Sequence, residues 1–162
     1  LQFYLSGGAG NTDPNASLGG IISTTAITNS SDNNLFDDVS GDEADAGDTE
    51  YRGIYLKNNH GSLTLQTSVV WFSSNTTSAN DTLDMALAGE GVNATMETVA
   101  NESTAPSGES FSAPASKGAG FAVGNVAFGQ RYGLWLRRTV SAAAAAVNAN
   151  AATISWEGDT SA

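Results

Sequence analysis

The sequence contains no cysteine, a single histidine (His60) and only six basic residues among 162. Without cysteine, neither a disulfide nor a thiolate–metal site can hold the fold together. Lysine and arginine bind phosphate backbones, so their scarcity and the net charge of −11 argue against nucleic acid as a partner. The longest apolar stretches fall far short of the roughly 20 residues that span a bilayer, so we expect no membrane contact.

The sequence also lacks the motifs of common catalytic and cofactor sites. It has no nucleotide fingerprint and no Gly-X-Ser-X-Gly element, and His60 lies in Asn-Asn-His-Gly, where a turn explains it. The acidic residues cluster without the aromatic stripe that would accompany a glycosidase cleft. We therefore expect no enzymatic activity and no cofactor, and interpret the chain as a structural or binding protein.

Short β-rich runs separated by glycine and polar residues dominate the remainder. The runs 51–57 and 62–72 are separated by Asn58-Asn59-His60-Gly61, which is typical of a hairpin or a closely connected strand pair. Period-two alternation places Leu63, Leu65, Thr67, Val69 and Trp71 on one core face. Similar runs follow at 82–88, 92–99, 123–129, 131–140 and 152–157.

This pattern predicts an all-β fold, an antiparallel sandwich of jelly-roll or immunoglobulin-like type, with long polar loops and little helix. We expect one domain over residues 1–162, with an N-terminal arm at about 1–20 and a long acidic loop at about 30–50. The alanine-rich residues 141–152 should form a connection with about one helical turn. Residues 101–120, which hold Pro106 and Pro114, should form a long loop or an edge segment.

The acidic loop should be exposed and pinned by Leu35, Phe36 and Val39. Its carboxylates are candidate Ca²⁺ ligands, because this cation prefers several carboxylates from a flexible loop, although the EF-hand spacing is absent. A plain solvated loop remains the favoured interpretation over a metal site. The weak Ca²⁺ candidates are Asp37, Asp38, Asp42, Asp45 and Asp48.

The tryptophans and two adjacent arginines have two interpretations each. Trp71, Trp135 and Trp156 could form a platform for sugar rings, but aromatic residues within strands favour the sandwich core. Arg137 and Arg138 are neighbours on a strand and should point to opposite faces. One of them should pair with an internal or interfacial carboxylate while the other meets solvent.

Three stretches resemble small virion structural proteins of tailed bacteriophages. These are Leu-Gln-Phe-Tyr-Leu-Ser-Gly-Gly at the start, residues 34–42 followed by 47–52, and Gly-Gln-Arg-Tyr-Gly-Leu-Trp-Leu-Arg-Arg-Thr-Val from residue 129. The resemblance implies a β-sandwich that coats or cements the capsid, or that sits on the tail, and it implies no catalytic residues. The alanine-rich segment departs from the pattern.

We therefore expect a decoration or cement protein on the capsid exterior, which binds the major capsid protein and associates with itself as a trimer or dimer. The alternatives are a tail or fibre accessory module that binds glycans, and a secreted carbohydrate-binding or adhesin domain. The interface candidates are Leu1, Phe3, Leu35, Phe36, Asp42, Glu43, Arg137 and Arg138.

Overall fold

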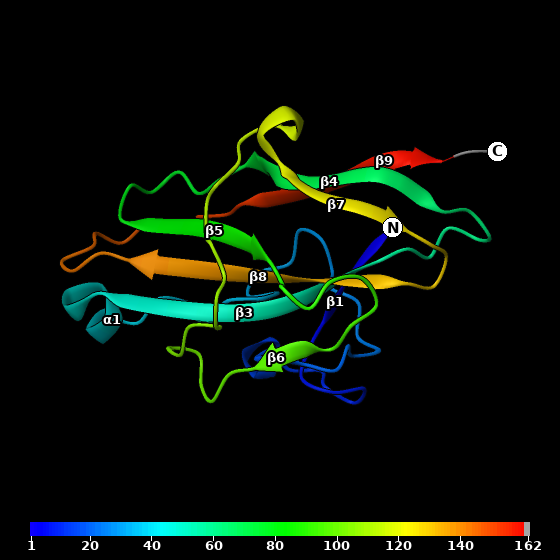
Figure 1. The fold of residues 1–162 in the computed structure, drawn as a ribbon. Helices are drawn as coiled ribbons and strands as arrows, with labels where there is room; N and C mark the ends of the chain where they lie inside the picture. The colour runs from blue at the N-terminus through cyan, green and yellow to red at the C-terminus, as the bar shows by residue number, and fades with distance from the viewer. Residues whose placement is uncertain (161–162) are drawn as a thin grey trace.

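The computed structural model describes residues 1–160, which form two antiparallel sheets packed face to face and a short third sheet beside them (Figure 1). The strands are β1 (Gln2–Leu5), β2 (Gly19–Gly20), β3 (Asp48–Lys57), β4 (Leu65–Ser74), β5 (Asp81–Leu87), β6 (Met96–Thr98), β7 (Phe121–Val126), β8 (Arg131–Val140) and β9 (Thr153–Thr160). Helix within these residues comprises α1 (Gly41–Ala46) and the 3-10 turns η1 (Pro14–Ala16) and η2 (Lys117–Ala119). The prediction of an all-β antiparallel sandwich with little helix is confirmed.

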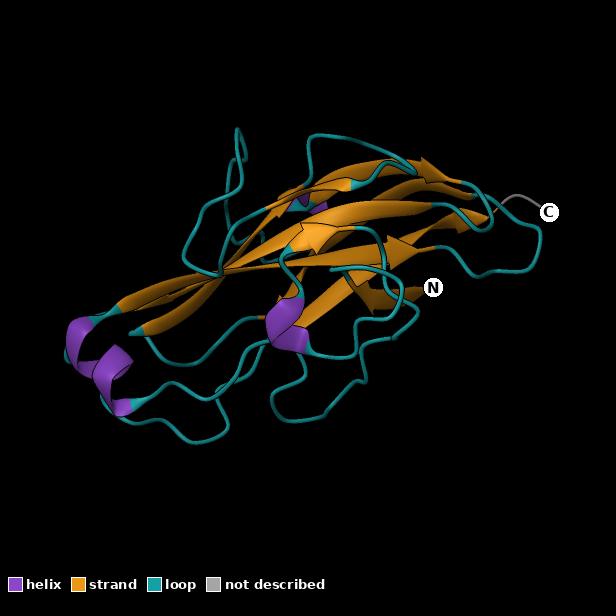
Figure 2. Ribbon diagram, turned by 90° about the horizontal axis from the view of Figure 1, so that it is seen from below, coloured by secondary structure: helices purple, strands orange, loops and turns teal. Residues whose placement is uncertain are grey.

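The larger sheet has the strand order β1–β3–β8–β5 and the smaller one β7–β4–β9. The two central strands of the larger sheet, β3 and β8, pair over ten residues each, from Asp48 opposite Val140 to Lys57 opposite Arg131. The strands run along the length of the sandwich, and α1 lies at one end of it (Figure 2).

The predicted hairpin between 51–57 and 62–72 is wrong, because the two strands belong to different sheets. β3 pairs with β1 and β8, whereas β4 pairs with β7 and β9. The buried side chain of Asn58 explains the corner between them: its amide donates to the carbonyls of Leu63 and Val126, at 2.9 Å each. These bonds direct the chain across the sandwich instead of back along β3.

The face predicted for 62–72 is correct only at its start. Leu65 joins the core between the two sheets, but Val70 and Phe72 join it next, in place of Val69 and Trp71. The register of β4 shifts around Ser68, and Thr67 has a φ of 47°. Such a bulge adds one residue to the strand, and one residue is enough to invert the alternation of side chains.

Both faces of the larger sheet are covered. One face packs against β4, β7 and β9 through Ile54, Leu134 and Phe72 among others. The opposite face packs against the short sheet of β2 and β6, with Tyr55, Met96 and Trp135 in a second cluster. β3 is therefore buried on both faces, which explains why it lacks a clear polar alternation.

Loops cover the free edges of the larger sheet. Where β1 ends, the amides of Tyr51 and Gly53 donate to the carbonyls of Glu102 and Ser17, at 2.7 Å each. On the other edge, Met85 exchanges two backbone hydrogen bonds with Ser112. The prediction that residues 101–120 form a loop or edge segment is confirmed, and the loop protects the sheet from pairing with other chains.

Two predicted segments need correction. The expected N-terminal arm at about 1–20 is not an arm: β1 is an edge strand paired with β3, and Gly19 and Gly20 pair with β6. The acidic loop at about 30–50 ends earlier than predicted, because α1 begins at Gly41 and β3 at Asp48. A capping box between Ser40 and Glu43 starts the helix, since each side chain binds the other residue's backbone amide.

The alanine-rich residues 141–152 form a connection between β8 and β9, as predicted, and contain no helical turn. The amides of Ala143 and Ala144 donate to the carbonyls of Asp45 and Ala44 in α1. This loop and α1 thus lie together at one end of the sandwich (Figure 1), which we call the acidic end.

Candidate binding site at the acidic end

A network of charged side chains is buried between the sheets near the acidic end. Glu50 lies directly opposite Arg138 in the β3–β8 pair, and Arg52 follows on the same face of β3. Glu50, Arg52 and Arg138 are all buried, and Arg138 forms an ion pair with Glu50. Together with Asp37 and Glu102, we call these residues the charge network.

The network ties three loops to the central strands. Arg138 also donates to the backbone carbonyl of Asp37 at 2.5 Å, and its guanidinium lies 3.3 Å from the Asp37 carboxylate. Arg52 Nη2 donates to Glu102 at 2.7 Å and to the Asn15 side-chain oxygen at 3.1 Å. A buried arginine fork thus holds the loops in place through bonds to several partners.

Phe36 covers both guanidinium groups. Its ring centroid lies 5.4 Å from Arg52 and 5.1 Å from Arg138. Cations placed over an aromatic face are attracted by its quadrupole, and the ring also shields the network from water. The acidic loop is therefore attached to the sandwich by an aromatic ring as well as by ion pairs.

Burial changes the acidity of Glu50. Desolvation raises the pKa of the Glu50 carboxyl above its ordinary value of 4.5, although Arg138 and Arg52 favour the charged form and oppose the shift. The charged form of Glu50 is therefore opposed by burial and favoured by Arg138 and Arg52.

A groove of about 860 Å³ opens beside the network, between the acidic loop and the alanine-rich loop. This volume is within the range of protein pockets that bind ligands. Four carboxylates belong to its lining, from Asp32, Asp37, Asp38 and Asp81, whereas its one basic side chain, Arg138, is already paired. Apolar side chains from strands and loops form its floor, including Phe3, Ile27, Ile54, Leu83, Leu136 and Ile154.

Asn150 fixes one wall of the groove. Its amide donates to the backbone oxygen and to Oδ2 of Asp81, while its side-chain oxygen accepts from the amides of Thr77 and Ser78. One asparagine therefore joins the alanine-rich loop to the start of β5.

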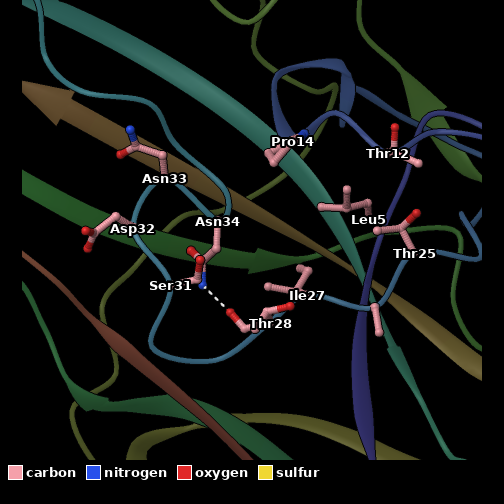
Figure 3. Close-up of a pocket in the computed structure, with 11 residues that line it drawn as sticks. Leu5, Thr12, Pro14, Thr25, Ile27, Thr28, Ser31, Asp32, Asn33 and Asn34 are labelled. Carbon is pink, nitrogen blue, oxygen red and sulfur yellow. Dashed lines mark hydrogen bonds between the residues drawn. The ribbon is translucent and has the colours of Figure 1, made fainter.

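A smaller recess of about 240 Å³, drawn in Figure 3, shares Ile27 and residues 31–34 with the groove. Asn34 donates to the carbonyl of Thr28 at 2.9 Å and closes the loop between the two hollows. Asp32 and Ile27 line both of them. Most of the loop residues that line the small recess are polar. The larger groove therefore presents more apolar side chains to a bound partner.

The structure brings several interface candidates together and leaves others apart. Phe3, Leu35, Phe36 and Arg138 line the groove. Asp42 and Glu43 lie in α1 at the acidic end. Arg137 and Leu1 belong neither to the groove lining nor to α1.

Arg137 points to the opposite face of the larger sheet from Arg138, as predicted. It binds Asp84 on β5 at 2.5 Å and lies 4.9 Å from the ring centroid of Phe111. Arg138 pairs with the internal carboxylate of Glu50, so the prediction that one arginine would meet a buried acid is confirmed. The prediction that the other meets solvent holds only in part, because Arg137 is 33% exposed and is paired with Asp84.

Leu1 is exposed at the start of β1, far along the sandwich from α1 (Figure 1). Leu1 precedes Gln2, which pairs with Lys57. Lys57 is the last residue of β3, and Asp48, near α1, is the first.

The Ca²⁺ candidates are spread over different elements. Asp37 is bound by Arg138, Asp42 and Asp45 lie in α1, and Asp48 begins β3. Asp38 is exposed and lines the groove. Within residues 1–160, no three histidine, cysteine or acidic side chains gather as a metal site would require.

Sequence reasoning missed the centre of the network. Arg52 was not among the candidates, and Glu50 was considered only as one carboxylate of the acidic loop. The order Glu50-Tyr51-Arg52 nevertheless places opposite charges on one face of an otherwise apolar strand. That pattern is a usable signal of a buried ion pair. Glu102 and Asn15 gave no such signal, because loops of unrelated sequence position bring them to Arg52.

The three tryptophans are buried, as expected for core residues: Trp156 packs in the core between the two sheets, Trp135 in the second cluster, and Trp71 lies outside both clusters. No helix within residues 1–160 has the length and apolar character to cross a membrane. Comparisons with protein-family models, curated proteins and solved structures return no match for this chain. The site must therefore be interpreted from its own residues, which offer fixed charges and an apolar groove.

Proposed function

We propose that this protein is a bacteriophage virion structural protein, a decoration or cement protein that binds the outside of the head and bridges neighbouring capsid subunits. One observation carries the proposal. The segments 34–42, 47–52 and 129–140, on which the resemblance to phage virion proteins rests, meet in the charge network through Phe36, Glu50, Arg52 and Arg138.

The surface at the acidic end supports a role in protein binding. Asp38, Asp42 and Asp45 are exposed around α1, on a chain with a net charge of −11. Such a surface complements a basic shell and repels free copies of the protein. The buried network beneath it keeps the loops in one conformation, which lowers the entropy lost on binding.

A lattice-binding protein gains strength by repetition. Modest contacts at each copy add up when neighbouring shell subunits present the same surface many times. The covered sheet edges and the core on both faces of the larger sheet supply a durable scaffold for such contacts.

Electron microscopy of native particles that carry this protein tests the proposal. Density for a small β-sandwich arrayed regularly over the head is the expected result, and density confined to the tail would overturn it. Particles stripped of the protein should release their genome at a lower temperature than intact ones.

A rebinding experiment then tests the surface. Stripped particles should rebind the wild-type protein, but bind the triple variant Asp38→Lys, Asp42→Lys and Asp45→Lys at least about tenfold more weakly. Glu157→Lys is the control, because Glu157 is exposed on β9 and pairs only with the exposed Lys117. Equal loss with the control would exclude the acidic end as the contact surface.

A further inference from the structure

The end of the sandwich opposite α1 carries an exposed apolar tip. The turn between β7 and β8, residues 127–130, lies at the far end of the molecule from α1 (Figure 1). Its Phe128 side chain is 55% exposed. Gly129, at φ 79°, gives the turn its tight bend, and the amide of Gly129 donates to the carbonyl of Asn58 at 2.8 Å. Phe128 is thus held on a fixed turn and points an aromatic ring at solvent.

Two cations lie beside this tip. Lys57 and Arg131 are direct partners in the β3–β8 pair. Arg131 follows the turn in sequence, and Lys57 precedes Asn58, whose backbone is hydrogen-bonded to Gly129 and Gln130 of the turn. The other four basic residues form ion pairs with carboxylates, whereas within residues 1–160 Lys57 and Arg131 form none. They rest instead over the rings of Tyr4 and Tyr55. Both cations are half-buried, and Arg131 also donates to the Asn93 side chain at 3.4 Å. This end of an otherwise acidic chain therefore carries two cations beside an apolar knob.

The groove at the acidic end has the complementary properties. Its floor is apolar, and Asp32, Asp38 and Asp81 belong to its lining without forming an ion pair within residues 1–160. The groove runs along the sandwich as far as Phe3 and Ile54, and Ile54 precedes Lys57 by three residues, about 10 Å along β3. The short β7–β8 turn is held at its own end by the hydrogen bond between Gly129 and Asn58. The turn cannot reach the groove of its own molecule, so a turn that enters it must come from another copy.

We propose that the groove binds the β7–β8 turn of a second copy of this chain, with Phe128 on the apolar floor and Lys57 and Arg131 facing the acidic lining. The contact joins two different surfaces, so it is head-to-tail, and repeated copies form a ring or an open chain. This proposal goes beyond the proposed role in the virion and does not depend on it.

The association is weak in solution. One buried aromatic side chain covers about 150–250 Å², well below the roughly 800 Å² that each partner buries in a stable complex. Repulsion between two copies of net charge −11 opposes it further. We therefore expect dissociation constants between about 10 µM and 1 mM, and more extended assemblies only where the copies are concentrated on a surface.

Sedimentation velocity on the purified chain tests the proposal with two complementary variants. Phe128→Asp removes the knob and leaves the groove intact. Ala151→Arg fills the groove with a bulky cation, at an exposed alanine that lines it, and leaves the knob intact. Each variant alone should weaken the association at least about tenfold.

A mixture of the two variants gives the decisive result. The knob of Ala151→Arg still fits the groove of Phe128→Asp, so the mixture should form a dimer of one copy each that grows no further. A symmetric interface would not be restored by mixing. A wild-type chain that stays monomeric at about 1 mM, or a mixture that stays monomeric, would overturn the proposal.

Matched controls separate the interface from general surface effects. Ile21→Asp changes an apolar side chain that is as exposed as Phe128 but lies outside the turn, and Asp42→Lys reverses an acid outside the groove lining. Both should associate like the wild type. If Ala151→Arg or Phe128→Asp fails to fold, Lys57→Glu and Asp38→Lys form a second complementary pair with the same expected mixing result. Loss of association in this experiment leaves the microscopy test of the virion role unaffected.

Discussion

Arg138 donates a hydrogen bond from Nε to Oε2 of Glu50 inside the sandwich, where the two residues are only 6% and 2% exposed. The two positions are 88 residues apart in sequence and directly opposite each other in the β3–β8 pair. This contact is the point at which the acidic loop, through Asp37, is attached to the central strands.

Replacing Arg138 by methionine should cost about 3 kcal/mol of unfolding free energy at neutral pH, because the change leaves Glu50 as a buried carboxylate with one cation fewer. Urea unfolding measures the loss. The double variant with Glu50→Gln should recover more than half of it, since the uncompensated charge is then absent. Asp84→Asn, which breaks the partly exposed pair with Arg137, should cost less than about 1 kcal/mol.

The pH dependence of stability should reveal the raised pKa of Glu50. The folded protein binds a proton at Glu50 over a range in which the unfolded chain has lost it. The stabilising contribution of Glu50 to the unfolding free energy is therefore fully present below its ordinary pKa of 4.5. It is lost as the pH rises through the pKa of Glu50 in the folded protein. The unfolding free energy of the wild type minus that of Glu50→Gln should fall as the pH rises above the ordinary pKa of 4.5. A difference that grows with pH would mean that the arginines lower this pKa.

Replacing Gly19 by alanine should destabilise the chain by at least about 3 kcal/mol. Gly19 has a φ of 86°, and a Cβ there would lie 1.8 Å from the carbonyl oxygen of Glu97 and 2.9 Å from the Trp135 ring. Gly8→Ala is the matched control, because Gly8 also has a positive φ but has open space around it. Thermal unfolding compares the two variants, and equal losses would show that the backbone angle alone, not the contact with β6, sets the cost.

Replacing Tyr55 by phenylalanine should cost about 2 kcal/mol. The buried phenol donates to the carbonyl of Gly20 at 2.5 Å and accepts from the amide of Met96 at 2.8 Å, so it joins β3 to both strands of the short sheet. The amide of Met96 in β6 should then exchange with solvent faster than in the wild type, while the amides of β8 should exchange as before. Tyr4→Phe, whose hydroxyl accepts only from the exposed Asn59, should change stability by less than about 1 kcal/mol.

Local patterns in the amino-acid sequence predict the all-β class, the positions of most strands and the opposite directions of Arg137 and Arg138. Period-two alternation is a property of neighbouring residues, so it can be recognised without knowing which strands pair. For the same reason the inward positions of Leu83, Met85 and Leu87 in β5 were predictable, and all three pack against the core.

Which strands share a sheet, and which residues form the site, depend on contacts between distant parts of the chain. The bulge near Ser68 inverted β4, and the buried Asn58 sent the chain across the sandwich after β3. The charge network joins Asp37, Glu50 and Arg138 over as many as 101 residues of sequence. A buried charge is costly unless it is paired, so the folded protein pairs the charges that its strands and loops bring together. A local sequence pattern cannot predict pairs between residues so far apart in the chain.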